Sequence, residues 1–334
     1  MYPDRSPVFN ALHRLVDAGS YHAMATRGDD VIGLLGTVHQ DLYFRGQPLP
    51  MVYFMDFKVD PDFRKGLTAY RMVRQATERE LASGTRLGLA TLLKNNEAPM
   101  AFTKGRGGFP ASLYLGDNRI FNCIPVRRLR TDERFTIETP GESDIPELVS
   151  LYNRYYATYR LAPRLTEATF RHYTSQIDGL QLGNFRVARR EGRIQAVVAM
   201  WDELAFRRYF VTRFNVRIRL ANGLIRFLSH FTEVPEQIRS HKPLRQLSLV
   251  LYAHDLSVDA LAALFRHANN LHVGGEYSLL QIQVHQDDPV NLALKGMTGV
   301  SLYSEIHLFT DTIQLAREIQ NEPGLIHLEF ENYL

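Results

Sequence analysis

The chain has 334 residues, which is enough for two ordinary domains, because a single hydrophobic core usually stops growing before roughly 250 to 300 residues. Hydrophobic residues make up 45% and charged residues 22%, values that are typical of a globular protein and exclude an intrinsically disordered chain. The formal net charge of +3 is small, and basic and aromatic residues do not alternate as in a nucleic-acid-binding module, so no nucleic-acid partner is expected.

The first clear elements are two long apolar and aromatic runs, Val31 to Phe44 and Pro50 to Val59. The segment between them, Arg45 to Pro48, is typical of a hairpin turn, so the runs are predicted to be neighbouring antiparallel strands. From Arg64 to Leu81 the apolar residues recur at three- and four-residue spacing. This spacing predicts an amphipathic helix, which Ser83 and Gly84 end.

Three further elements follow in the first half: a buried strand at Leu87 to Leu93, a short helix at Glu97 to Thr103 and a strand at Ser112 to Ile124. A strand, a crossover helix and a second strand form a right-handed unit with parallel strands. The helix from Arg64 is therefore predicted to connect two parallel strands. The single cysteine, Cys123, lies in a predicted strand and is expected to pack there, and one cysteine cannot form an internal disulfide.

The second half repeats this order of elements after a polar, arginine-rich linker at Arg127 to Glu133. No residue-level repeat accompanies it, so the duplication is one of architecture. Two domains are predicted, 1–130 and 131–334. The helices expected in the second are Glu142–Tyr159, Thr166–Ile177, Ile218–Phe231, Val258–Leu271 and Val290–Lys295, and its strands are Asn184–Ala188, Ile194–Trp201, Gln246–Tyr252, Ser278–Val284, Ser301–Phe309 and Gly324–Tyr333.

The segment Asp56 to Ala69 has the features of a phosphate-binding helix start, because a strand ends near Pro61 and a turn containing Gly66 opens a helix. The first N–H groups of a helix lack intrahelical acceptors and lie at the positive end of its dipole, so they favour a diphosphate. Gly66 leaves room for a close approach, and Arg64 adds a charged donor. This stretch predicts a backbone cradle for phosphate.

The same stretch resembles the signature of the GNAT acetyltransferases, in which a strand is followed by V-x-P-x-x-R and a glycine-containing turn into a helix. Val59, Pro61 and Arg64 match that order. The family's usual turn is R-x-x-G-x-G/A, and the glycine of this chain comes one position early, in Arg64-Lys65-Gly66-Leu67-Thr68-Ala69. The resemblance covers about Tyr21 to Arg127.

What this resemblance implies is an α/β fold of two GNAT-like domains, each a mixed, mainly antiparallel sheet with a parallel pair around a crossover helix. The second domain resembles the family in element order only, and Asp255 stands where a phosphate would sit, so no cofactor is expected there. The implied activity is transfer of an acyl group from acetyl-coenzyme A, or another acyl-coenzyme A, to an amine of a small molecule or peptide.

By the same resemblance, backbone groups of Phe57, Lys58 and Val59 would pair with the pantetheine arm and polarise the thioester carbonyl. A second match lies downstream, where Asn95 or Asn96 would touch the arm. Phe102 stands near the position where many members have a tyrosine as general acid, and a phenyl ring cannot donate a proton. The implied cofactor-binding residues are Phe57, Lys58, Val59, Arg64, Lys65, Gly66, Leu67, Thr68, Ala69, Asn95, Asn96 and Phe102.

Attack on a thioester requires a neutral amine, so a base must lie within hydrogen-bond reach of it. Asp56 and Glu97 are the candidates, with a solvated Asp56 and a helix-capping Glu97 as equally open alternatives. N-myristoyltransferases, which pair two GNAT-like halves, use a terminal carboxylate, and that similarity makes Leu334 a third candidate. The histidines form no metal-ligand pattern, so no metal is expected.

Other hypotheses about the function of the chain stay open. It could be a GNAT-shaped binding or regulatory module without activity, since the glycine is shifted and Phe102 replaces the usual acid. Tyr152, Tyr155, Tyr156 and Tyr159 could line a substrate cleft, although packing of one helix on a sheet is favoured. No apolar run reaches the roughly 18 residues of a membrane helix, and the first residues lack a signal-peptide core, so a cytoplasmic location is expected, with oligomers possible.

Overall fold

The computed structural model describes residues 2–4, 19–64, 66–94, 102–105, 112–205, 207–211, 223 and 239–327. Their helices are α2 (Thr68–Ala82), α4 (Ile145–Tyr156), α5 (Glu167–Gln176), α7 (Val258–His272) and α8 (Ile313–Asn321). Their strands are β1 (Tyr2–Asp4), β2 (Ser20–Arg27), β3 (Asp30–Phe44), β4 (Gln47–Val59), β5 (Leu87–Leu93), β6 (Leu113–Cys123), β7 (Thr136–Glu138), β8 (Phe185–Arg190), β9 (Arg193–Trp201), β10 (Arg208–Phe210), β11 (Gln246–His254), β12 (Leu279–His285) and β13 (Gly299–Thr310).

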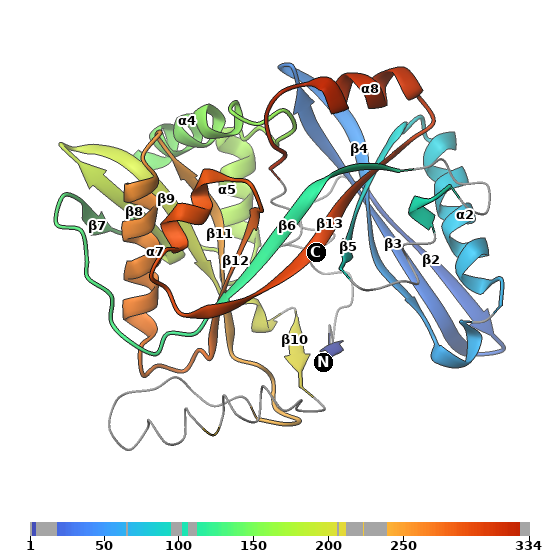
Figure 1. Cartoon of the computed structure of the whole chain (residues 1–334), viewed down its shortest axis with the longest axis horizontal. Coiled ribbons are helices and arrows are strands. Elements are labelled where there is room, and N and C mark those ends of the chain that lie inside the picture. Colours follow the sequence, from blue (N-terminus) through green and yellow to red (C-terminus); the bar gives the residue numbers. More distant parts are fainter. Residues whose placement is uncertain are drawn as a thin grey trace.

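One mixed, mostly antiparallel sheet organises this part of the chain. Its eleven described strands follow the order β2-β3-β4-β5-β13-β6-β12-β11-β9-β8-β7, and β1 pairs separately with β10. The sheet runs through two lobes, and β6 and β13 form the long twisted ribbon that joins them (Figure 1). None of the described helices is long and apolar enough to cross a membrane.

The first lobe contains the predicted hairpin, in which β3 and β4 are antiparallel and Phe44 pairs with Gln47. Its turn residues Arg45 and Gly46 both have positive φ, as a tight hairpin turn requires. After β4, the side chain of Asp60 caps a short 3-10 helix at Pro61–Phe63, so α2 begins at Thr68 rather than at the predicted Arg64. The parallel pairing of β4 with β5 around α2 is confirmed.

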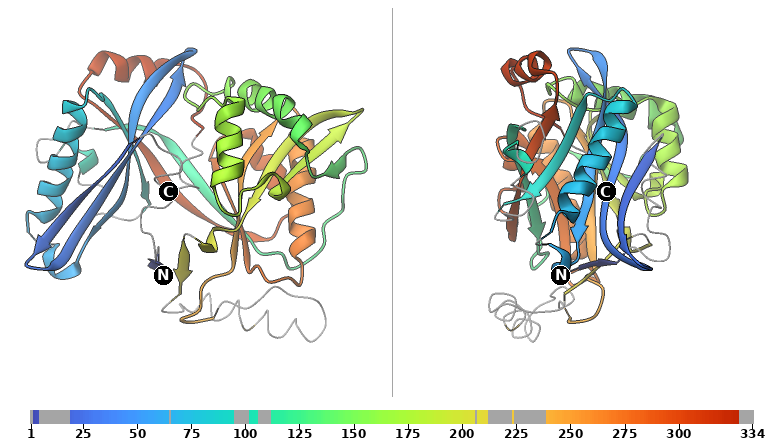
Figure 2. Two further views of the ribbon diagram at one scale, coloured as in Figure 1. Left: turned by 180° about the vertical axis from the view of Figure 1, so that it is seen from behind. Right: turned by 90° about the vertical axis from the view of Figure 1, so that its right-hand side faces the viewer.

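The second lobe repeats that unit with β11, α7 and β12, and β11 and β12 are parallel. Helices α4 and α5 cover one face of its sheet and α7 covers the other (Figures 1 and 2). The preferred interpretation of the tyrosines on α4 is confirmed, because Tyr152, Tyr155 and Tyr156 are buried in the main hydrophobic core. Cys123 is also fully buried in this core, as predicted.

Strand β13 crosses from the second half of the sequence into the first lobe. It lies between β5 and β6 and is antiparallel to both, with Leu308 opposite Leu89 and Leu302 opposite Ile120. The sheet therefore continues without a break across the proposed boundary between residues 130 and 131. The division into 1–130 and 131–334 stays a prediction.

Several elements differ from those predicted. Strand β2 and helix α8 were not anticipated, and the predicted helix at Val290–Lys295 is a 3-10 helix at Pro289–Leu294. Residues 324–327 contain only an isolated bridge between Ile326 and Leu161 where a strand was predicted. Apart from Gly223, the predicted helix Ile218–Phe231 lies outside the described residues, as do most of the predicted helix Glu97–Thr103 and residues 328–334.

Candidate functional site

The parallel strands β4 and β5 separate soon after they meet. Within the described residues they pair only at Val52 with Gly88 and at Tyr53 with Leu89. Beyond that point, a bulge shifts the register of β4 against β3, and Asp56 in the bulge has a φ of +51°. A bulge bends and twists its strand, so it turns the end of β4 away from β5. The result is a V-shaped opening between two strand ends.

A groove of about 1220 Å³ follows this opening beneath α2. It runs along the inner face of the helix, from Ala69 and Tyr70 in the first turn to Glu80 and Leu81 in the last. Most side chains along it are apolar, as a site for a largely apolar ligand arm requires. Its strand residues include Val52, Phe54, Met55, Asp56, Phe57, Lys58, Val59, Leu87, Gly88, Ala90, Thr91, Leu92, Leu93, Phe309 and Thr310.

The start of α2 lies at the mouth of this groove. No side chain caps the helix at Leu67, and the first helical hydrogen bond runs from Arg71 N to Leu67 O at 2.9 Å. The N–H groups of the first turn therefore have no intrahelical acceptor. Gly66 and Ala69 line the groove, and a Cβ on Gly66 would meet only Phe63 O, at 3.9 Å. Space for an anion exists beside the helix start.

The predicted site residues fall into two groups. Phe57, Lys58, Val59, Arg64, Gly66, Ala69 and Phe102 line the groove together with Asp56. Leu67 and Thr68 form the start of α2 without being among the lining residues. The remaining predicted residues lie outside the described part of the chain: Lys65, Asn95, Asn96, Glu97 and Leu334.

Three of the predicted side chains have specific contacts at the mouth. Arg64 Nε donates to Val59 O at 2.9 Å, which ties the turn before α2 to the end of β4. The Phe57 and Phe102 rings meet edge to face, with centroids 5.7 Å apart. These contacts fix the entrance of the groove between the bulged strand and the segment that contains Phe102.

The Asp56 side chain is buried and lies among cations. Lys58 Nζ is 3.0 Å from Asp56 Oδ1, and the Asp56 side chain is only 5% exposed. Arg207, from the second half of the sequence, is buried and donates from Nε to Glu203 Oε2 at 2.7 Å. Burial lowers the pKa of the Arg207 guanidinium. The charge and hydrogen bond of Glu203, together with Tyr209 and Asp56, have the larger opposite effect, so the pKa is raised overall. Asp56 is thus not the solvated surface residue of the alternative interpretation.

The inner end of the groove holds polar groups that the sequence did not reveal. Glu80 is 3% exposed, accepts from Thr37 Oγ1 at 2.6 Å and lies 2.8 Å from His39 Nε2. Thr77, one turn earlier, also lines the groove. A glutamate on an amphipathic helix is usually solvated. Only the packing of α2 against β3 shows that Glu80 is buried.

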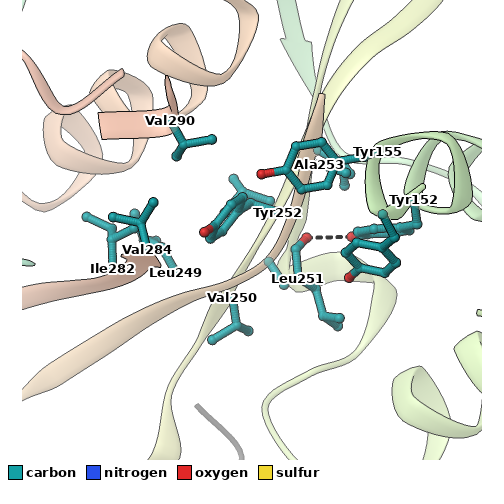
Figure 3. Packing of buried hydrophobic residues seen from close by; sticks show 14 of the residues in the cluster. Tyr152, Tyr155, Leu249, Val250, Leu251, Tyr252, Ala253, Ile282, Val284 and Val290 are labelled. Carbon is teal, nitrogen blue, oxygen red and sulfur yellow. Dashed lines mark hydrogen bonds between the residues drawn. The ribbon is translucent and has the colours of Figure 1, made fainter. Parts of the chain in front are cut away.

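A second opening of the same kind exists in the second lobe and is filled. β11 bulges where Leu251 has a φ of +45°, and its pairing with β12 ends at Leu249. Tyr152 Oη donates to Leu251 O at 2.5 Å, and Tyr155 and Tyr252 pack beside it (Figure 3). Aromatic side chains thus occupy the second V, whereas the first V opens into the groove.

Comparisons with known proteins give matches in structure alone. No protein-family model and no curated protein matches the chain. Saccharomyces cerevisiae N-myristoyltransferase with bound myristoyl-CoA matches over 85% of this chain and 64% of its own length, with a TM-score of 0.57 and 14% identity. Its structure with myristoyl-CoA and inhibitors matches over 86% and 66%, with a TM-score of 0.55 and 14% identity. The chain thus spans about two thirds of these proteins, and likeness at this identity shows a shared fold.

Proposed function

We propose that this chain, which has the fold of the GNAT acyltransferases, transfers an acyl group from acyl-coenzyme A to an amine acceptor. One observation carries the proposal: the V between β4 and β5, the bulge at Asp56 and the uncapped start of α2 all line one groove. Each of these features suits a different part of the same ligand. The acyl group is acetyl or a longer chain, and the acceptor is a small molecule or a peptide end.

The diphosphate of coenzyme A would bind at the start of α2. The N–H groups of Thr68, Ala69 and Tyr70 are the donors, and the helix dipole adds to their attraction for an anion. Arg64 and Lys58 supply positive charge at the mouth, and both line the groove. The open space beside Gly66 supports a close approach of the phosphate. Lys65 would add a further cation.

The end of β4 would hold the pantetheine arm and the thioester. Beyond Tyr53, β5 no longer pairs with β4 in the described residues, so the side of β4 that faces the opening can bind a ligand. A backbone N–H near Phe57 or Val59 would donate to the carbonyl oxygen as negative charge develops on it. Asn95, Asn96 and Phe102 remain proposed contacts of the arm.

The reaction needs a base near the bulge. The amine nitrogen forms a bond to the acyl carbon, the carbon–sulfur bond breaks, and the proton leaves the nitrogen for a base while the thiolate departs. Asp56 is our first candidate because it lines the groove at the bulge. Glu97 and the terminal carboxylate of Leu334 remain proposed alternatives. We expect the second half, 131–334, to shape the acceptor side and the protein to work in the cytoplasm.

Coenzyme A binding and thiol release test this function separately. At a hundredfold excess over its dissociation constant, coenzyme A should stabilise the protein by about 2.7 kcal/mol, and a thermal-shift assay measures this. Acyl transfer is measured by release of the free thiol from acetyl- and longer acyl-coenzyme A with amines and peptides. Binding without thiol release would favour the inactive module that the shifted glycine and Phe102 suggested. The absence of any shift with coenzyme A would overturn the proposal.

A further inference from the structure

The two faces of the sheet differ along β13, one of the strands that join the lobes. Side chains alternate between the faces of a strand, and Phe309 lies on the face toward α2, where it lines the groove. The even-numbered residues of β13 lie on the opposite face. Among them, Ile306 and Leu308 are buried in the main core, whereas Leu302 and Val300 are 50% and 59% exposed. The core therefore covers only the later part of β13 on this face.

Leu93 connects this exposed surface to the groove. It lies four residues beyond the last pairing of β5 with β4, is 51% exposed and lines the groove. Leu93 pairs with Ser304, so Leu302 is its diagonal neighbour on the same face, roughly 7–8 Å away. Val300 follows two residues earlier on that face. We call Leu93, Leu302 and Val300 the apolar strip, and it continues from the opening between β4 and β5.

The surroundings of the apolar strip are uncharged on its own face. Its neighbours there, from β13, β6 and β12, are Ser304, Ile120, Asn122 and Gln281. The charged side chains next to it in the same part of the sheet lie on the other face: Lys94, Asp117, Arg119 and Glu305. Adjoining apolar side chains that stay exposed often mark a binding surface. The apolar strip therefore favours an uncharged, apolar group.

We propose that the apolar strip binds the acceptor, and that Leu302 is a specificity-determining residue for an amine that carries a large apolar side chain next to its nitrogen. This inference rests on the proposed acyl transfer and goes beyond it by naming the class of acceptor. Coenzyme A would bind on the α2 side, and the acceptor would reach the thioester through the V from the other face. Asp56, the proposed base, lines the opening from β4, across from Leu93.

The expected strength of this preference follows from the apolar area that the acceptor buries. A tenfold preference corresponds to about 1.4 kcal/mol. At about 25 cal/mol per Å², this requires roughly 55 Å² of apolar surface to be removed from water. Contact of one acceptor side chain with a few half-exposed side chains is enough for this.

Leucinamide and glutaminamide test the preference, because their side chains are uncharged and similar in size but differ in polarity. Transfer from acetyl-coenzyme A is measured by thiol release. The unsubstituted protein should have about tenfold higher kcat/KM for leucinamide. Leu302→Gln should remove this preference and leave the affinity for coenzyme A, measured by calorimetry, unchanged. Val300→Gln, at the far end of the apolar strip, should reduce the preference as well.

Leu292→Gln is the matched control, because Leu292 is 67% exposed and lies in the 3-10 helix Pro289–Leu294 rather than in the apolar strip. It should keep the tenfold preference. Equal kcat/KM of the unsubstituted protein for the two acceptors would overturn the inference. Retention of the preference by both Leu302→Gln and Val300→Gln would overturn it too.

Binding of leucinamide, followed by saturation-transfer NMR, separates a failure of this inference from a failure of the proposed function. If thiol is released without a preference, only the inference fails. If no thiol is released but leucinamide binds and Leu302→Gln weakens its binding, the acceptor surface is supported and acyl transfer fails. The absence of both thiol release and binding would overturn the inference together with the proposed function.

Discussion

Gly88 stands at the apex of the V, where a side chain would collide with an aromatic ring. A Cβ at this position would lie 2.5 Å from Cε2 of Phe54, which lines the groove. Gly88→Ala should therefore push Phe54 into the groove and destabilise the protein by about 1–3 kcal/mol. Urea unfolding measures the stability, and calorimetry with coenzyme A measures the affinity, which should fall.

Gly183→Ala is the control for this prediction, because a Cβ on Gly183 would meet no atom within 4 Å. It should leave both quantities nearly unchanged. A Gly88→Ala protein with unchanged stability and affinity would show that Phe54 moves out of the way without effect on the groove.

Cys123 should be inert in the folded protein. Burial raises the pKa of its thiol to about 12, above the usual value of about 8.5. The folded state therefore keeps the thiol proton between about pH 8.5 and 12, where the unfolded state loses it, and stability falls as pH rises through this range. Urea unfolding should show a shallower alkaline decline for Cys123→Ala than for the unsubstituted protein. Rapid reaction of the native thiol with a disulfide reagent at pH 8 would contradict this prediction.

Single residues at the mouth of the site could be predicted from the sequence, whereas those at its inner end could not. Val59, Arg64 and Gly66 belong to one contiguous segment whose order is itself the signal, and Arg64 and Gly66 line the groove. Thr77 belongs to the three- and four-residue spacing that predicts the helix, whereas Glu80 looks like a solvated position of it. That both residues line a groove depends on β3 and on strand separation, which no local pattern encodes.

At the scale of elements, helix α2 contributes to the stability of the free protein and provides the proposed diphosphate site. One substitution can separate these two roles. A carboxylate in the first turn of a helix is favourable by about 0.3–1 kcal/mol, but it would repel a bound diphosphate. Ala69→Glu should therefore keep or slightly raise the melting temperature of the free protein and weaken coenzyme A binding by at least tenfold. Differential scanning fluorimetry with and without coenzyme A measures both effects.

Gln75→Glu adds the same charge to an exposed position of α2 and is the control for Ala69→Glu. It should leave the coenzyme A affinity unchanged. If Ala69→Glu also bound coenzyme A normally, the diphosphate would have to bind elsewhere.

Most elements could be predicted from their own residues, but their neighbours in the sheet could not. Long apolar runs predicted β3 and β4, three- and four-residue spacing predicted α2, and α7 was predicted from the recurring order of elements. The position of β13 between β5 and β6 is a different matter, because it depends on pairings between residues far apart in sequence. Phe309 and Thr310, which line the groove from β13, were missed for this reason.

At the scale of the whole molecule, the continuous sheet should make the two lobes unfold together. Trp201 is the single tryptophan, is fully buried in β9 and so reports on the second lobe. Urea unfolding followed by its fluorescence should coincide with unfolding followed by circular dichroism, as expected for one cooperative unit. Coenzyme A should raise the midpoint urea concentration of the transition followed by Trp201 fluorescence, although the proposed coenzyme A site is in the first lobe. Two separate transitions would instead support independent domains.

The placement of β13 also has a consequence for the newly made chain on the ribosome. β5 and β6 flank a gap that β13 fills only after roughly 190 further residues have been synthesised. At roughly 5–20 residues per second, this delay lasts on the order of 10–40 s. During this time the edges of β5 and β6 that pair with β13 have no partner strand. We expect nascent chains of this protein to depend on chaperones during that interval.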